Sequence, residues 1–498
     1  MRLVVRLAPL LLLPLTLTHC SANGAGEPGA SLTAGAANAN GGTGTLGSSG
    51  ANGSIAGGPS TTGGANTTGG ANTAGGASTT GGASATGGAS GGGTSDGKAG
   101  SVSAGGSGGS APIPPLDCGS EGWAVENHGP PKNRVNYVIL ADGYTATTVD
   151  TELVTHINAM LKRRFEHESG QPYGRYRKFV NICVMKAISQ NNGIGNGPTP
   201  FGGGNGGDRL AAVDEAKVNA YLKSKVPASF EIDWKAVVLN QAKWENTGSR
   251  LMLWSGAHDD APGAALHEGG HGFHQLADEY CAKGTGAGCG NDTNKTGTAG
   301  KAEAEINTAG DPVTTDGKWT LWLGTTQKGL NVPDKGATGV QGTFVGSRYL
   351  DAGQYRPSAN SMMNSLFGLD LNTSFNSVSR EQIIFSIWRA VTPIDSADPP
   401  AGAVTNPATL TVNVIDPAVI NVDWTVDGTT TSNGGTTFST AQLASGTHAI
   451  SAKAYDNASL DLVKNRTSIC PTSVTGGYCH GTSWKRSEQT VTWTVSKP

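Results

Sequence analysis

The chain has 498 residues, of which 75 are Gly, 36% are hydrophobic and 15% are charged. This composition excludes a single packed core that would include the whole chain. The formal net charge of −3 provides no basic surface for nucleic acid, so we expect no nucleic-acid partner.

Residues 1–20 have the pattern of an export signal. Arg2 and Arg6 precede a short apolar run, Leu10 to Leu17, that is too short to cross a bilayer as a mature helix. The run ends in Leu-Thr-His-Cys, which is similar to the bacterial lipobox, where the Cys (here Cys20) is lipidated. We predict an exported protein. It is either a lipoprotein of the outer membrane or cell surface, with Cys20 as its only membrane anchor, or a secreted protein.

Residues 21–113 are predicted to be a disordered linker. They are almost entirely Gly, Ala, Ser, Thr and Asn, and between Thr61 and Ser90 they repeat in units of six residues. Such a repeat has no large apolar side chain to bury, and a Gly-rich coil of about 90 residues spans roughly 50 Å. A linker of this kind would hold the following domain away from a membrane surface.

Residues 114–395 are predicted to form an α/β domain, because apolar runs alternate there with apolar residues at helical spacing. The predicted strands are 135–140, 179–185 and 234–239, and the predicted helices are 148–167 and 208–225. The Gly-rich residues 198–207 are expected to form a mobile loop. Residues 245–253 are either an edge strand that pairs with an extended substrate or an ordinary hairpin.

The strongest functional signal is His267-Glu268-Gly269-Gly270-His271, which has the pattern HExxH. Residues four apart lie on one face of a helix, about 6 Å apart along its axis, so both imidazoles converge on one tetrahedral metal ion. Glu268 lies about 100° round the helix from His267, from where it reaches a water on the metal. We therefore predict a Zn2+ site with His267 and His271 as ligands and Glu268 as the general base. The glycines each cost about 1 kcal/mol in a helix interior, so metal coordination or close packing must compensate.

A catalytic zinc needs a third protein ligand. His274 lies about 10 Å further along a continuous helix than His267, too far to share the ion. The ligand is expected where the chain turns away from the helix, and Asp278 and Glu279 are the candidates there.

Residues 403–498 are predicted to be an all-β, immunoglobulin-like sandwich. Short segments alternate apolar and polar residues with period two, and Asp-Gly and Asn-Gly-Gly supply turns between them. The segments are 410–414, 422–426, 449–452 and 491–495. We expect this region to serve in binding or as a scaffold.

The chain has seven cysteines. If Cys20 carries lipid, six remain for disulfides in an oxidising compartment. Proximity in the sequence predicts Cys281–Cys289 and Cys470–Cys479, which leaves Cys118 for Cys183.

The block from His267 to Tyr280, HEGGHGFHQLADEY, resembles the zinc-site signature of the IgA peptidase family of bacterial zincin-type zinc metallopeptidases. Residues 135–144 look like the strand that opens that family's domain, and 355–363 like the segment with the Met-turn, in Met362 or Met363. The resemblance implies a zincin-like fold for the α/β domain. By analogy with the related snapalysins, it favours Asp278 over Glu279 as the third ligand.

These features together predict a secreted or surface-anchored zinc metalloendopeptidase acting on protein or peptide substrates. Zinc held by His267, His271 and Asp278 would activate a water, and Glu268 would take up its proton. Neither the substrate nor the oligomeric state follows from the residues. The alternatives are a catalytically silent surface adhesin with a structural metal, and a metal-dependent hydrolase of a non-peptide bond.

Overall fold

The computed structural model describes residues 113–207, 209–281, 305–310, 318–327, 340–364, 373–431, 435–467 and 484–498. The export signal and, apart from Ile113, the linker lie outside these residues and stay predictions. Gly108–Pro498 forms one compact unit. In the part of the chain that the structure describes, no helix is both long and apolar enough to cross a membrane.

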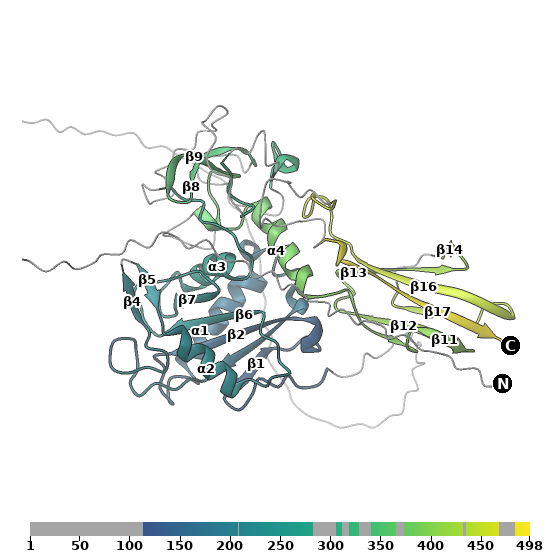
Figure 1. The fold of residues 1–498 in the computed structure, drawn as a ribbon, viewed down its shortest axis with the longest axis horizontal. Helices are drawn as coiled ribbons and strands as arrows, with labels where there is room; N and C mark the ends of the chain where they lie inside the picture. The colour runs from purple at the N-terminus through teal and green to yellow at the C-terminus, as the bar shows by residue number, and fades with distance from the viewer. Residues whose placement is uncertain are drawn as a thin grey trace, which may run out of the picture. The chain divides into compact units, whose positions relative to one another are not determined.

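A five-stranded sheet in the order β1-β3-β2-β6-β7 organises the first region (Figure 1). Its strands are β1 (Gly122–Glu126), β2 (Val135–Asp142), β3 (Val180–Met185), β6 (Trp234–Leu239) and β7 (Leu251–Ser255). β1 runs antiparallel to β3, and the other neighbours are parallel. Parallel strands are covered on both faces, which explains why β2, β3 and β6 appear in the sequence as continuous apolar runs.

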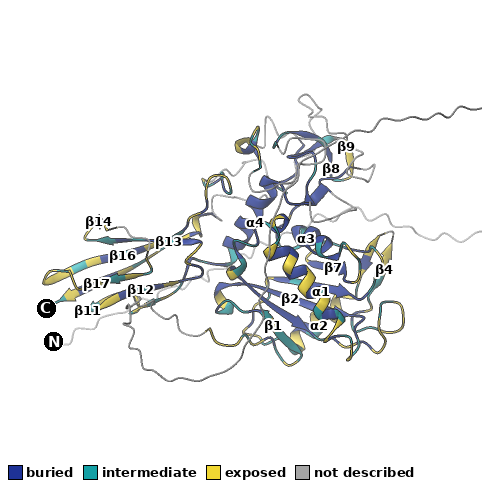
Figure 2. Ribbon diagram, turned by 180° about the vertical axis from the view of Figure 1, so that it is seen from behind, coloured by how far each residue is buried: buried dark blue, intermediate teal, exposed yellow. Residues whose placement is uncertain are grey.

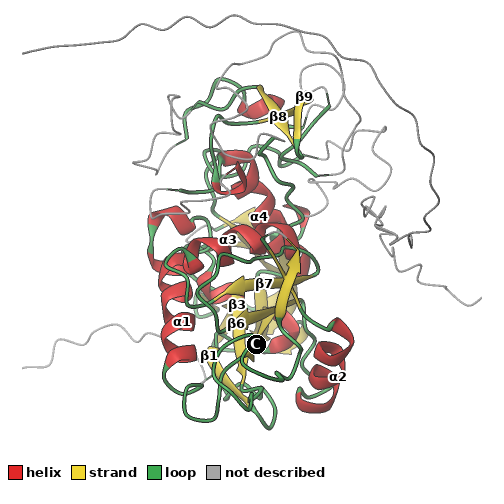
Figure 3. Ribbon diagram, turned by 90° about the vertical axis from the view of Figure 1, so that its left-hand side faces the viewer, coloured by secondary structure: helices red, strands yellow, loops and turns green. Residues whose placement is uncertain are grey.

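Helices cover both faces of this sheet. α1 (Glu152–Leu161) continues into a π-helical turn (Lys162–Glu166) and, with α3 (Ala261–Gly272), lies on one face, while α2 (Glu215–Lys225) lies on the other (Figure 3). Short 3-10 turns occupy Pro131–Asn133, Glu168–Gly170, Arg177–Phe179, Thr320–Trp322 and Met362–Asn364. A hairpin of β8 (Phe344–Ser347) and β9 (Leu350–Arg356) follows, and α4 (Ser377–Ala390) ends the region.

The helix predicted for residues 208–225 is wrong in its first part. β4 (Gly204–Gly207) and β5 (Leu210–Ala212) pair as a hairpin, and the helix begins only after Asp214. The Asp214 side chain caps it by accepting from the backbone N–H of Lys217 at 3.2 Å. The preceding loop is anchored, because the buried Asp142 carboxylate accepts from the N–H groups of Phe201 and Gly203 at 3.1 and 2.8 Å.

The last region is all-β, with a three-stranded sheet (β10-β12-β15) and a five-stranded sheet (β11-β17-β16-β13-β14). The strands are β10 (Ile394–Asp398), β11 (Gly402–Thr405), β12 (Thr409–Val414), β13 (Ile420–Val426), β14 (Thr429–Thr430), β15 (Thr437–Ser439), β16 (Gly446–Asp456) and β17 (Glu488–Lys497). All four predicted segments lie within these strands. A mixed α/β region followed by an all-β region is therefore confirmed, whereas the zincin-like and immunoglobulin-like assignments stay predictions.

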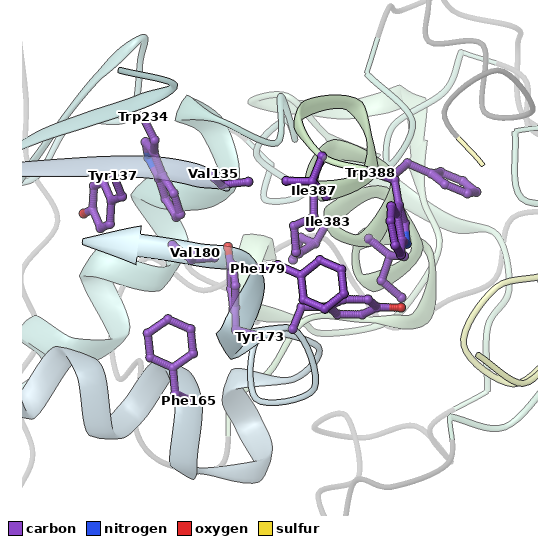
Figure 4. Packing of buried hydrophobic residues seen from close by; sticks show 14 of the residues in the cluster. Val135, Tyr137, Phe165, Tyr173, Phe179, Val180, Trp234, Ile383, Ile387 and Trp388 are labelled. Atoms are coloured by element: carbon purple, nitrogen blue, oxygen red, sulfur yellow. The ribbon is translucent and has the colours of Figure 1, made fainter. Parts of the chain in front are cut away.

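The two regions share a hydrophobic core at α4. Every residue of α4 from Ser377 to Trp388 is buried (Figure 2). Its inner side chains Ile383, Ile387 and Trp388 lie close to Phe179, just before β3 (Figure 4), and the Trp388 and Phe179 rings meet edge to face at 5.2 Å. Asp456, at the end of β16, accepts from Trp388 Nε1 at 3.0 Å.

A disulfide joins Cys118 to Cys183, as predicted, and ties the chain before β1 to the inner strand β3. Cys281 is also disulfide-bonded. Its predicted partner Cys289 and the predicted pair Cys470–Cys479 lie outside the described residues, so those pairings stay predictions.

Candidate metal centre

The HExxH motif lies on α3, which begins at Ala261 with Pro262 in its first turn. Proline suits this position because the first helical N–H groups have no partner within the helix, whereas the Asp260 side chain makes no capping hydrogen bond. The glycines inside the helix have a packing reason. A Cβ at Gly269 would lie 2.8 Å from the Trp234 ring, and one at Gly270 would lie 2.6 Å from Met363 Sδ. Close approach of the helix to its neighbours thus explains residues that are poor helix formers.

The structure brings His267, His271 and Asp278 together. Asp278 Oδ1 lies 3.2 Å from Nε2 of each histidine, and the two Nε2 atoms are 3.3 Å apart. The three atoms form a nearly equilateral triangle. His267 is buried and Asp278 and His271 are largely so.

Hydrogen bonds to the backbone determine which imidazole nitrogens carry protons. His267 Nδ1 lies 2.7 Å from the carbonyl oxygen of Met362, and His271 Nδ1 lies 2.7 Å from that of Leu276. A carbonyl only accepts, so each Nδ1 donates and each neutral ring presents a bare lone pair at Nε2. Two nitrogen lone pairs and a carboxylate oxygen therefore face one another.

A metal ion fits this arrangement. With tetrahedral bonds of about 2.0–2.1 Å, neighbouring ligand atoms are about 3.3–3.4 Å apart, and the triangle has edges of 3.2, 3.2 and 3.3 Å. Asp278 Oδ1 is buried and has no hydrogen-bond partner among the residues that the structure describes, which is what a ligand atom requires. The backbone carbonyls that fix both rings act as the outer partners typical of histidine ligands.

Without a metal, the same groups compete for protons. Burial opposes protonation of His271, but the neighbouring Asp278 carboxylate outweighs it and raises the pKa of His271 to about 9. The pKa of His267 is raised too, against its burial, by the Asp278 carboxylate beside it. Burial acts against the Asp278 carboxylate, yet the two histidines hold its pKa well below the ordinary value.

Glu268 lies beside the triangle, and ligand atoms of His267, Glu268 and His271 all lie within 4.8 Å of one another. Its side chain is buried, and burial raises its pKa against the opposing effect of both histidines. Gly248 closes over it, because a Cβ there would lie 2.6 Å from Glu268 Oε2 and 2.3 Å from His271 Cδ2. Gly248 was not recognised from the sequence, which offers no signal for such a contact.

Glu279, the other candidate ligand, points away from the triangle. Its carboxylate accepts from Asn307 Nδ2 at 2.9 Å, from Ser361 Oγ at 2.6 Å and from Asn376 Nδ2 at 2.9 and 3.0 Å. Its hydrogen-bonding capacity is taken up by these donors, so Glu279 holds the surrounding segments together and Asp278 is the carboxylate at the triangle.

The remaining candidates take structural positions. His274 is completely buried and its ring lies 5.4 Å from both Tyr173 and Trp234, away from the triangle. Met362 supplies the carbonyl for His267, whereas Met363 places its sulfur against Gly270. Both methionines therefore lie at α3, in different roles.

A residue missed in the sequence, Tyr349, reaches the same carboxylate. Its hydroxyl lies 2.8 Å from Asp278 Oδ2 and 2.8 Å from the hydroxyl of Tyr280. The Tyr280 ring lies parallel to the His267 ring at 6.4 Å. Tyr349 is 71 positions from Asp278 and 69 from Tyr280, and only the tertiary structure brings it there.

Residues 124–336 match the family described as IgA Peptidase M64, which confirms the resemblance seen in the sequence. No curated protein matches the chain. The matched segment contains α3 and Asp278 but ends before Tyr349 and Met362.

Proposed function

Because residues 124–336 belong to the IgA Peptidase M64 family, a family of zinc metallopeptidases, we propose that this protein is an exported zinc endopeptidase. The observation that carries the proposal is the triangle of lone pairs formed by His267, His271 and Asp278, with edges of 3.2–3.3 Å. Two imidazoles and one carboxylate are a donor set typical of catalytic zinc, and they leave one position open. A zincin-like fold for residues 114–395 is part of the same proposal.

Zinc bound at the triangle would polarise the scissile carbonyl and make a water acidic enough to attack near neutral pH. Glu268 accepts a proton from that water and returns it to the leaving nitrogen, so the peptide bond is cleaved without net change at the carboxylate. The Met362 and Leu276 carbonyls hold the histidine rings in one tautomer throughout.

We place an extended peptide along residues 246–249, beside β7. Thr247 pairs with Leu253 through two backbone hydrogen bonds of 3.0 and 2.8 Å, so this segment continues the sheet at the β7 edge. Gly248 then approaches Glu268 and His271 with no side chain between. A backbone strand at the rim of a site is a common way to bind extended peptides, and it favours a peptidase over a hydrolase of another bond.

The test is Glu268→Gln in the full chain, with zinc content and cleavage of an unstructured protein such as casein measured together. We expect zinc to be retained and hydrolysis to fall by about 10²–10⁴-fold, as for loss of a general base. Glu215→Gln, on the exposed start of α2, is the matched control and should behave as wild type.

Full activity of Glu268→Gln would exclude the proposed base. A wild-type protein that binds zinc but cleaves nothing would instead favour the adhesin with a structural metal. Cell fractionation tests export, and release of a Cys20→Ser protein from the membrane fraction would support lipidation.

A further inference from the structure

Asp278 has two oxygens with different partners. Oδ1 lies 3.2 Å from both histidine nitrogens, while Oδ2 lies 2.8 Å from the hydroxyl of Tyr349. A carboxylate only accepts, so the Tyr349 hydroxyl is the donor. The phenol therefore occupies the oxygen that does not face the imidazoles.

The direction of the hydrogen bond between the Tyr280 and Tyr349 hydroxyls follows from this. It lies 2.8 Å from the Tyr349 oxygen, and Tyr349 has already used its one proton on Asp278. Tyr280 therefore donates to Tyr349, which donates to Asp278. This chain of hydrogen bonds orients the carboxylate from the side opposite its contact with the histidines.

The hairpin tip is held against the centre by its backbone. The N–H groups of Arg348 and Tyr349 donate to the carbonyls of Asp278 and Tyr280, both at 3.0 Å. Arg348 also pairs with Glu305, with Nη1 and Oε2 2.8 Å apart. These contacts fix the turn at Asp278 independently of the phenol.

The turn conformation is an unfavourable one for a tyrosine. Arg348 and Tyr349 have φ of +50° and +63° between the paired residues Ser347 and Leu350, a geometry that normally selects Asn-Gly. Tyr349 is 52% exposed, so burial of its ring does not account for its presence. The hydroxyl contact with Asp278 does, together with an edge-to-face contact between the Tyr349 and Tyr280 rings at 5.0 Å.

We propose that Tyr349 is a positioning residue that keeps Asp278 monodentate. With Oδ2 occupied by the phenol, only Oδ1 faces the metal position, and the fourth coordination site stays open for water. The inference rests on the proposed zinc function. It adds a residue beyond the matched segment 124–336.

The test compares full-chain wild type, Tyr349→Phe and Tyr455→Phe. Tyr455 lies on β16 in the all-β region and serves as the matched control. Zinc affinity is measured by competition with a chelator, and coordination by the visible spectrum of the cobalt-substituted protein. For Tyr349→Phe we expect about 10–100-fold weaker zinc binding, the usual effect of losing an outer partner of a ligand. We also expect weaker cobalt absorption, as the carboxylate takes a second coordination position.

Tyr349→Gly separates this role from folding. Glycine suits a positive φ, so unfolding of the metal-free protein by urea should be no easier than for wild type, while zinc affinity falls as in Tyr349→Phe. If Tyr349→Phe binds zinc within about twofold of wild type and gives the same cobalt spectrum, the positioning role is refuted. If wild type itself binds no zinc, the proposed function fails, and the inference fails with it.

Discussion

The metal centre and the junction between the two regions both contain buried carboxylates, but the two carboxylates have different partners. At the junction, Asp456 accepts from Arg175 Nη2 at 2.7 Å, Tyr176 Oη at 2.6 Å and Trp388 Nε1 at 3.0 Å. At the centre, Asp278 Oδ1 is buried, and none of the residues that the structure describes donates a hydrogen bond to it. It faces Nε2 of His267 and Nε2 of His271.

The difference separates a structural carboxylate from a ligand. Glu279 and Glu381 follow the junction pattern, and Glu381 accepts from Trp322 Nε1 at 2.9 Å and from the N–H of Asn465 at 2.8 Å. A buried carboxylate surrounded by donors is satisfied by the protein alone. A buried carboxylate oxygen that faces two imidazole nitrogens instead needs a cation between them, which is a proton in the metal-free protein or a bound metal ion. The inventory of donors therefore distinguishes Asp278 from its neighbour Glu279.

Asp278→Asn should have the largest effect, because it removes the anionic ligand while keeping the side-chain size. We expect hydrolysis to be lost and zinc no longer to stabilise the fold. Wild type should gain about 2.7 kcal/mol of unfolding free energy when free zinc is 100 times its dissociation constant. Urea unfolding with and without zinc measures this gain.

The matched change is Glu279→Gln. It should lower the unfolding free energy with or without zinc, because Glu279 accepts hydrogen bonds from the protein. It should keep the gain on adding zinc, because Glu279 does not face the metal position. The distinction between the two carboxylates fails if both variants lose the gain, or if Asp278→Asn keeps it.

Asp456→Ala tests the junction and should have the next largest effect. Removing one partner of a buried ion pair costs about 3–5 kcal/mol, here with Tyr176 and Trp388 also left without an acceptor. Urea unfolding should show the same loss in zinc-loaded and chelator-treated protein. Asp150→Ala, in an exposed pair with Lys186, is the control and should cost about 0–1 kcal/mol. A loss seen only with zinc would show that the junction is not independent of the metal centre.

The smallest expected effect is the number of protons that the protein releases when it binds zinc. In metal-free protein the pKa of His271, raised from 6.5 to about 9, leaves the ring protonated near neutral pH. The contribution of the protonated His271 ring to the unfolding free energy is complete below pH 6.5 and is lost as the pH rises through about 9. Zinc requires the bare nitrogen, so zinc affinity rises over the same interval.

We therefore expect zinc binding near pH 7.5 to release about one proton. Calorimetry in two buffers of different ionisation enthalpy measures this number. Binding without proton release would show that the metal-free histidines are neutral, and that Asp278 does not hold a proton on them.

Much of the fold and centre was predictable because local patterns encode it. The apolar runs of β2, β3 and β6 and the spacing of His267 and His271 depend on residues near in sequence. The same periodicity failed at 210–214, where pairing between β4 and β5 overrides helix propensity.

What could not be predicted depends on contacts across the fold. Tyr349 reaches Asp278 over 71 positions, and Ser361 reaches Glu279 over 82. Gly248 has no neighbouring motif that marks it as the residue above Glu268. The residues alone left Asp278 and Glu279 open, and only the resemblance favoured Asp278. The donors that surround Glu279, such as Asn307 and Asn376, come from contacts that no spacing rule provides.

The buried helix α4 has a consequence for how this protein can be divided. Asn376, just before α4, donates to Glu279, while Glu381 within it accepts from residue Asn465 in the far C-terminal part. A gene fragment that stops at residue 336 would encode the HExxH helix without the Met362 carbonyl and without α4. One that stops at residue 395 would leave Trp388 and Glu381 on α4 without their partners Asp456 and Asn465. A truncated or recombined gene should therefore keep the codons from Cys118 to at least Asn465 together.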